Sequence, residues 1–219
     1  KKIPAGDNPT FVYRIQVDVT DTAGETRSGE RVVRLGYTAL QADIAAAEWQ
    51  ESTGPVRLNL RTTTLDGEPA PATGTLTVFK LQMPDTPVPA ELFGARRGAG
   101  ETASVRTAEW QRWPAGDQAL SREFTTGVDG TLAVELDLPP GVYRAQLHTQ
   151  DRYGSPVRAM QPLLVLDPAA RTFPVKTPAF FGARPGTVEP GDSFEAFWAT
   201  GYAEGPALVE IFSDGEWLQ

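Results

Sequence analysis

Cysteine is absent from the 219 residues, and histidine occurs once, as His148. The missing cysteine excludes disulfide bonds, thiolate zinc sites and cysteine nucleophiles from this segment. A serine triad could draw only on His148, and the sequence contains no nucleophile-elbow, phosphate-loop, dinucleotide or paired-histidine motif. The 28 acidic residues leave a hydrolase with two carboxylates formally open, but no feature of the sequence favours it.

The sequence also lacks a long apolar run and an excess of basic residues. No stretch approaches the ~18 apolar residues of a membrane span. The formal net charge is −8, and an acidic surface repels phosphate backbones and anionic lipids. We therefore expect neither nucleic acid as a partner nor a membrane span. The first residues contain no initiator methionine or signal peptide, so we read the chain as a piece of a longer protein.

Short alternating runs separated by turns fill most of the sequence. Residues 56–61 and 132–138 alternate apolar and polar side chains, as strands do when one face is buried and the other is solvated. Gly and Pro are spread evenly and form turn signals at residues 65–67, 128–130 and 139–141. Only residues 40–50 could form a helix, and they lack a convincing cap. The predicted fold class is all-β, with tandem antiparallel β-sandwich modules of immunoglobulin or fibronectin-III type.

One segment of the sequence repeats without a gap. Each copy predicts a strand, an Asp-x-x-Gly turn and a second strand. Val12, Tyr13, Arg14, Gln16, Asp21 and Gly24 recur as Val142, Tyr143, Arg144, Gln146, Asp151 and Gly154. Self-similarity of this kind is the signature of tandem arrays, and we favour two copies of one module over chance convergence on common strand and turn residues.

The repeat predicts the domain boundaries. If each hairpin closes a module, residues 1–37 are the C-terminal strands of one module and residues 38–167 are a complete module. Residues 168–219 are then the N-terminal strands of a third. The middle module carries a long insertion at about residues 84–118, which is rich in proline and small residues. Loops of this length are usually functional or disordered.

Arginines make this insertion a predicted protease-sensitive loop. The predicted cleavage residues are Arg96, Arg97, Arg106 and Arg112. Exposed loops of this composition concentrate proteolytic nicking. Cleavage could trigger a rearrangement of the parent protein or could have no consequence, and we favour the second interpretation.

The repeated strands carry a family resemblance. Residues 13–21 with 24–29, residues 62–68, and residues 187–194 leading into Trp198 resemble segments of bacterial alpha-2-macroglobulin-family proteins. The resemblance covers nearly the whole chain, but its motifs are strands and turns. It implies macroglobulin-like β-sandwiches in a secreted or periplasmic protein that inhibits proteases by trapping them. Many members of the family use a Cys–Gln thioester, which this cysteine-free chain cannot contain.

The polar residues that stand out have structural explanations. Alternation puts Tyr143 and Leu147 on one face of a strand and His148 on the other, so His148 should be a surface residue. The conspicuous carboxylates stand in Asp-Gly or Asp-x-x-Gly turns, where the side chain caps its own backbone. These carboxylates are Asp21, Asp66, Asp129 and Asp151. Calcium binding would need a denser run of oxygen ligands, so we expect no metal and no cofactor.

Tryptophan supports the alternative function. Trp110 and Trp113 lie in the insertion, where exposed rings could stack on sugars, but large amphipathic residues more often fold a loop back onto its domain. Trp49, Trp198 and Trp217 are expected in the core or between modules. We therefore predict a non-enzymatic scaffold segment of a protease trap. Its partners would be neighbouring modules of the same chain and, through the full-length protein, target proteases. The alternative is a carbohydrate-binding or adhesive β-sandwich module of a multidomain surface protein.

Overall fold

The computed structural model describes residues 10–87, 109–184, 187, 189, 191–205, 208, 210, 212–213 and 216–217. Within these residues the chain is almost entirely β, with a single short 3-10 helix, η1 (Glu109–Arg112). The predicted all-β class is confirmed. The strands in chain order are β1 (Thr10–Thr20), β2 (Thr26–Gly36), β3 (Gln41–Ala45), β4 (Gln50–Glu51), β5 (Val56–Thr63), β6 (Thr73–Leu81), β7 (Ala115–Thr125), β8 (Thr131–Leu136), β9 (Gly141–Gln150), β10 (Pro156–Leu166), β11 (Phe180–Arg184), β12 (Glu195–Ala199), β13 (Phe212–Ser213) and β14 (Glu216–Trp217).

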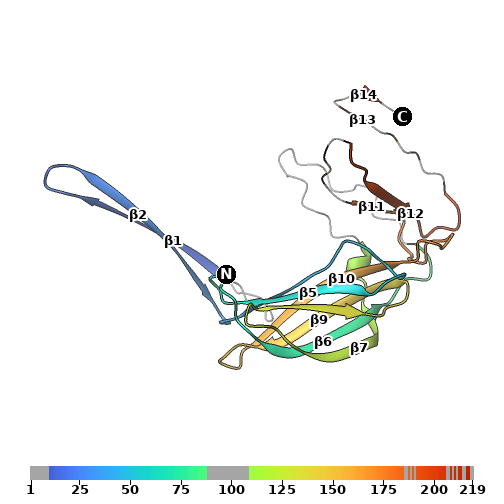
Figure 1. Ribbon diagram of the computed structural model, residues 1–219, viewed down its shortest axis with the longest axis horizontal. Coiled ribbons are helices and arrows are strands. Elements are labelled where there is room, and N and C mark those ends of the chain that lie inside the picture. The colour runs from blue at the N-terminus through green and yellow to red at the C-terminus, as the bar shows by residue number, and fades with distance from the viewer. Residues whose placement is uncertain are drawn as a thin grey trace.

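The strands from β3 to β10 form a β-sandwich. One sheet has the order β3-β5-β8 and the other the order β4-β10-β9-β6-β7. All pairings within the two sheets are antiparallel except the two-residue parallel contact between β4 and β10. Figure 1 shows the sandwich at the centre of the chain, with the β1–β2 hairpin extending away from one end and β11 to β14 at the other.

The core of the sandwich lies between these two sheets, and alternation explains which residues enter it. β5 reads buried-exposed over its whole length, so Val56, Leu58 and Leu60 face inward while the residues between them face solvent. From the opposite sheet, Leu76 and Leu147 complete the same cluster. The alternating runs predicted from the sequence therefore give the strands whose apolar faces meet.

The structure resolves two details that the sequence left open. Residues 40–50, the only stretch that could have been a helix, contain β3 and the first residue of β4, in keeping with the all-β prediction, because β3 finds a partner in β5. β7 begins at Ala115, inside the expected insertion of residues 84–118, and pairs with β6. Of that insertion, residues 88–108 lie outside the described residues.

The two predicted hairpins have the same backbone geometry. Tyr13 pairs with Val33 as Tyr143 pairs with Leu163, and all rows of the β9–β10 ladder have an equivalent in β1–β2, which has one further row, Thr10 with Gly36. In each turn the Asp accepts a backbone hydrogen bond from the residue two positions on and another from the residue four positions on. The glycines that close the turns, Gly24 and Gly154, have φ angles of 86° and 80°, which favour glycine. Thus β1–β2 and β9–β10 are the same structural unit.

Candidate functional site

Alternate residues of β9 and β10 supply two different cores. Tyr143 and Leu163 face into the sandwich, whereas Val142 and Leu164 face the opposite way. On that outer side they join a second hydrophobic cluster, which we call the junction cluster. It contains Trp49, Leu81, Trp110, Val142, Leu164, Leu166, Val175 and Phe180, with Trp113, Phe173 and Phe197 packed against it. The cluster joins the sandwich to the segment that follows β10.

Aromatic rings pack against one another in the junction cluster. The ring of Phe180 meets that of Trp49 edge-on, with centroids 6.2 Å apart, and Phe173 stacks on Phe180 at 6.1 Å. Gly182 lets β11 come close to the ring of Trp49, because a Cβ added at this position would lie 2.5 Å from a ring carbon of Trp49. Pairs of this kind contribute roughly 0.5–1.5 kcal/mol beyond the area they bury. The junction is therefore closely packed.

Arg184 adds a polar clamp to the same junction. Its guanidinium forms an ion pair with Glu51 of β4 and another with Glu195 of β12, the latter at 2.7 Å. It also lies over the ring of Trp49, 4.9 Å from the centroid. The hydrogen bonds to Glu195 and Glu51 raise the pKa of Arg184 above its usual value. One side chain thus contacts both the sandwich and the segment that follows it.

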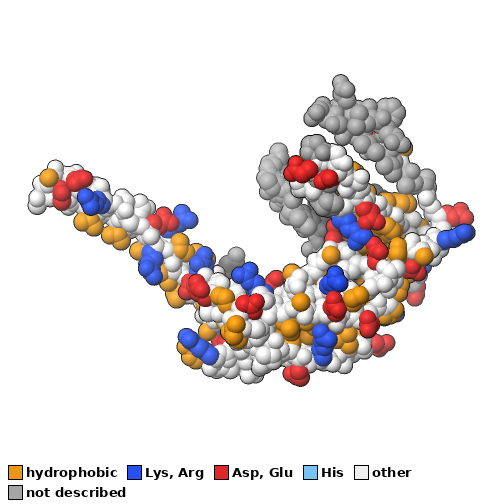
Figure 2. Space-filling model, viewed as in Figure 1, with side chains coloured by type: hydrophobic (Ala, Val, Ile, Leu, Met, Phe, Trp, Pro, Cys, Tyr) orange, Lys and Arg blue, Asp and Glu red, His pale blue; other side chains and the backbone are white. Residues whose placement is uncertain are grey.

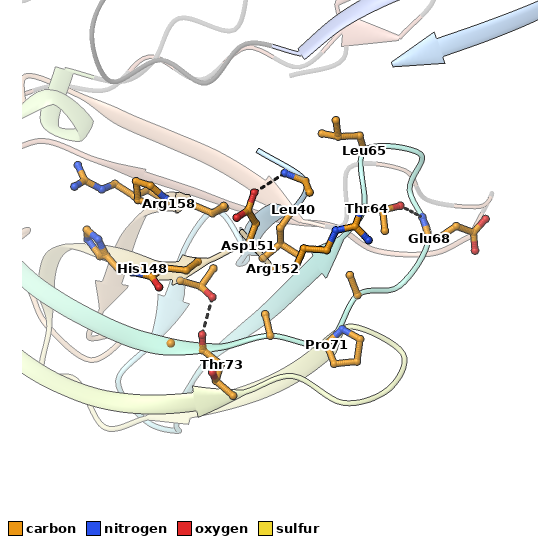
Figure 3. A pocket seen from close by; sticks show the side chains of 18 of the residues that line it. Leu40, Thr64, Leu65, Glu68, Pro71, Thr73, His148, Asp151, Arg152 and Arg158 are labelled. Carbon is orange, nitrogen blue, oxygen red and sulfur yellow. Dashed lines mark hydrogen bonds between the residues drawn. The ribbon is translucent and has the colours of Figure 1, made fainter. Parts of the chain in front are cut away.

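The junction at the other end of the sandwich is open and polar. An open depression of about 1180 Å³ lies where the β1–β2 hairpin meets the sandwich. In Figure 3, His148 and Arg158 lie next to each other on one side of the depression, and Arg152 extends towards Thr64. Side chains of both signs line it, including Arg34 and Asp66, whose charged atoms are 4.0 Å apart. A depression of mixed charge shows no preference for a ligand of one sign.

Asp151 holds the incoming chain at this open junction. Its Oδ1 accepts the turn hydrogen bonds from Tyr153 and Ser155, and its Oδ2 accepts one from the backbone N–H of Ala39 at 2.8 Å (Figure 3). These hydrogen bonds, that from Ala39 first, lower the pKa of Asp151. The turn of the last hairpin therefore also fastens the segment through which the chain enters the sandwich.

His148 lies on the surface, as predicted. It is exposed on β9, and its Cα partners across the sheet are Arg158 and Thr75. Its Nε2 is 3.5 Å from the side-chain oxygen of Gln146. None of these neighbours is a carboxylate that could orient the imidazole as a general base. Within the described ranges, no three His, Cys, Asp or Glu side chains come together as a metal site.

The turn carboxylates behave as predicted at three of the four positions. Asp21, Asp129 and Asp151 each accept hydrogen bonds from their own turns. For Asp129, the bonds from the hydroxyl and backbone N–H of Thr131 lower its pKa. The prediction for Asp66 is wrong. The hydroxyl of Thr64 accepts the hydrogen bond from the N–H of Glu68 there, because Thr64 occupies the first position of that turn.

The tryptophans divide between the junction and the surface. Trp110 is 3% exposed and Trp113 packs against the same cluster, so the insertion folds back onto the sandwich at this point. Trp49 is buried in the junction as expected. The expectation for Trp198 is wrong: it is 41% exposed, because strand alternation sends its neighbour Phe197 towards the cluster instead. The side chain of Trp217 lies outside the described residues.

Only one of the predicted cleavage arginines can be placed. Arg112 is exposed at the end of η1, between Trp110 and Trp113. Arg96, Arg97 and Arg106 lie outside the described residues.

The residues of the junction between the sandwich and the segment after β10, which we call the closed junction, were not predicted from the sequence. Arg184, Glu51 and Phe180 were not singled out, although phenylalanines recur at positions 173, 180, 181, 194 and 197, after the predicted boundary at residues 167–168. That recurrence is the signal that could have located the junction.

Comparison with protein-family models and with curated proteins finds no match to this chain. Among the described residues, no helix has the length and apolar character needed to cross a membrane.

Proposed function

We propose that this chain is a non-catalytic scaffold segment of a bacterial alpha-2-macroglobulin-like protein, which inhibits proteases by trapping them. The observation that carries the proposal is the occurrence of one hairpin, with one register and one turn, at two places in the chain. Such repetition is typical of tandem arrays, and the resemblance of these strands implies a macroglobulin-like array. Residues 1–37, 38–167 and 168–219 then belong to three successive modules, in a protein that works in the periplasm or outside the cell.

The closed junction supports a mechanical role. A scaffold that positions other parts of a large protein needs defined angles between modules. Trp49, Phe180 and Arg184 fix one such angle by ring packing and ion pairing. In this proposal the direct partners of the chain are its neighbouring modules, and target proteases meet it only through the full-length protein.

The predicted protease-sensitive loop remains part of the proposal, with a preference among its arginines. Arg112 lies in η1 between Trp110, which is buried, and Trp113, so its backbone is held against the sandwich. Proteases cleave segments that can be drawn out of the fold. We therefore expect limited trypsin digestion to cut first at Arg96, Arg97 or Arg106. First cleavage at Arg112, or outside residues 84–113, would contradict this.

The alternative of sugar binding gains nothing from the tryptophans that suggested it. A ring that stacks on a sugar must present a face to solvent, whereas Trp110 is buried and Trp113 is partly buried against the junction cluster.

Inhibition by the protein encoded by the complete gene tests the proposed function. A trapped protease keeps its active site but is enclosed, so cleavage of a large protein substrate should fall while cleavage of a small peptide substrate continues. The control is the same protease inactivated covalently beforehand. If the protease must cleave the trap to be enclosed, the inactive form should not co-elute with the full-length protein on size-exclusion chromatography. Equal loss of both activities would indicate an active-site inhibitor, and no loss of either would contradict protease inhibition.

A further inference from the structure

The two hairpins have the same ladder but differ in burial. On β9, Tyr143 and Leu147 are at most 1% exposed beneath the β3-β5-β8 sheet, whereas their counterparts Tyr13 and Val17 on β1 are each 53% exposed. The difference extends along the strand. The exposed apolar side chains on this side of the β1–β2 hairpin, which we call the open face, are Phe11, Tyr13, Ile15, Val17, Val19 and Leu35.

The open face is one continuous surface. Strand alternation puts every odd-numbered residue of β1 on it, and the register adds Val33 and Leu35 from β2. Towards the tip, Arg27, Gly29 and Arg31 of β2 border the apolar row of β1. Figure 2 shows hydrophobic side chains running along one side of the hairpin. The opposite side is mostly polar: it carries Arg14, Gln16 and Asp18, with Arg14 paired to Glu30, and its apolar residues are Val12 and Val32. An exposed apolar stripe backed by a polar face marks an interaction surface.

We propose that the open face binds a three-stranded antiparallel sheet of the β3-β5-β8 kind, carried by the same polypeptide. In β9–β10 the equivalent side chains belong to one buried cluster with side chains of β5 and β8, which present apolar residues at every second position. A partner of the same alternation would fit the open face row by row. This pairing would make the hairpin part of the second sheet of a sandwich, as β9–β10 is in the central one.

The size of the open face favours a covalently linked partner over a second copy of the chain. With 11 residues in each strand, a rise of ~3.3 Å per residue and a strand spacing of ~4.8 Å, the face covers roughly 350 Å². A face of this size is small for an association between separate proteins, whose specific interfaces bury ~1,200 Å² or more of accessible surface in total. A sheet in the same polypeptide loses less translational freedom when it docks.

The tip of the hairpin indicates where the partner sheet begins. Asp151 uses Oδ1 for its own turn and Oδ2 for the N–H of Ala39, which lies just before β3. Asp21 makes the same two turn bonds through Oδ1. Its Oδ2 is then the acceptor for a backbone N–H just before the first strand of the partner sheet.

Single cysteines test this proposal, because the 219 residues contain no native thiol and labelling can be read by mass spectrometry on peptides from this segment. Val17→Cys and Val19→Cys place a thiol on the open face, and Gln16→Cys and Asp18→Cys place one on the opposite face as matched controls. Each variant would be made in the protein encoded by the complete gene and in the 219-residue chain alone. The measurement is the rate of maleimide labelling in native buffer.

In the complete protein, we expect thiols at positions 17 and 19 to react at least about tenfold more slowly than in the 219-residue chain, because a buried thiol reacts only during local opening. The control thiols should react equally fast in both. Equal rates at positions 17 and 19 in the two proteins would overturn the proposal. Protection that appears in the 219-residue chain and rises with its concentration would overturn it in favour of a second copy. The proposal rests on tandem organisation and not on protease trapping, so the inhibition assay can fail while the labelling result holds.

Discussion

The β1–β2 and β9–β10 hairpins allow one local structure to be compared in two surroundings. They share strand register, turn hydrogen bonds and a positive-φ glycine. They differ in what covers them: Leu147 is fully buried, and its counterpart Val17 is half exposed. Alternation and turn residues therefore specify the hairpin, whereas its stability depends on what surrounds it: a covering sheet and, for β9–β10, the flanking strands β6 and β4. A two-stranded hairpin alone is marginally stable in water.

Truncating the equivalent apolar residues should give the largest difference between the hairpins. We expect Leu147→Ala to lower the free energy of unfolding by about 2–5 kcal/mol, because it leaves a cavity in the core. Val17→Ala should change it by less than about 0.5 kcal/mol, because no core surrounds Val17. Urea denaturation followed by tryptophan fluorescence measures both. Similar losses would mean that the open face is covered within the 219-residue chain.

Removing the hydroxyl groups of the equivalent residues Tyr143 and Tyr13 should affect the stability of the chain differently. The hydroxyl of Tyr143 donates to the carbonyl of Pro139 at 2.8 Å, and burial raises its pKa. Tyr143→Phe should cost about 1 kcal/mol in unfolding free energy, since it leaves this acceptor without its partner. Tyr13→Phe should have no measurable effect, because Tyr13 is half exposed. Equal effects on the denaturation midpoints would contradict the difference in burial.

Acid should reveal the extra hydrogen bond of Asp151. Because its pKa is lowered in the folded chain, Asp151 stabilises the fold fully above the unfolded value of about 3.9, and this contribution is lost as the pH falls through the folded pKa. The difference in urea midpoint between the parent chain and Asp151→Asn should therefore narrow below about pH 3.9. The control is Tyr143→Phe, which removes no carboxyl group. The difference in urea midpoint between the parent chain and this variant should stay constant below about pH 3.9.

Surface ion pairs should matter least, whichever part of the chain they occupy. Arg14–Glu30 on the hairpin and Arg57–Glu135 on the sandwich both have N–O distances of 3.1 Å and exposed side chains. Glu30→Gln and Glu135→Gln should each change the unfolding free energy by less than about 1 kcal/mol. Urea denaturation in low and high salt measures both variants. A loss of unfolding free energy above about 1 kcal/mol for Glu135→Gln, present in low salt and reduced in high salt, would contradict this, because surface charge would then contribute substantially to the stability of the sandwich.

Local patterns predicted the strands, while long-range contacts decided what the patterns left open. Alternation placed Leu58 inside and His148 outside, because each strand has only two faces. Residues 40–50 resisted prediction because their alanines suit a helix, and only the distant β5 makes a strand of them. Trp198 was misplaced because its apolar character says nothing about which face of β12 meets the junction cluster. The ion pairs of Arg184 with Glu51 and Glu195 join residues far apart in sequence, so no local motif indicates them.

Hydrogen exchange of the 219-residue chain tests the central comparison most directly. Backbone amides in the hydrogen-bonded rows within β1–β2 and within β9–β10 have the same partners by register, so a difference in their protection reports the surroundings of each hairpin. For β9–β10 these surroundings are the covering sheet and the flanking strands β6 and β4. We predict that β9–β10 amides exchange only through global unfolding, while β1–β2 amides exchange orders of magnitude faster through local opening. Equal protection in the two hairpins would contradict the account, because the β1–β2 ladder would then be stable without a covering sheet.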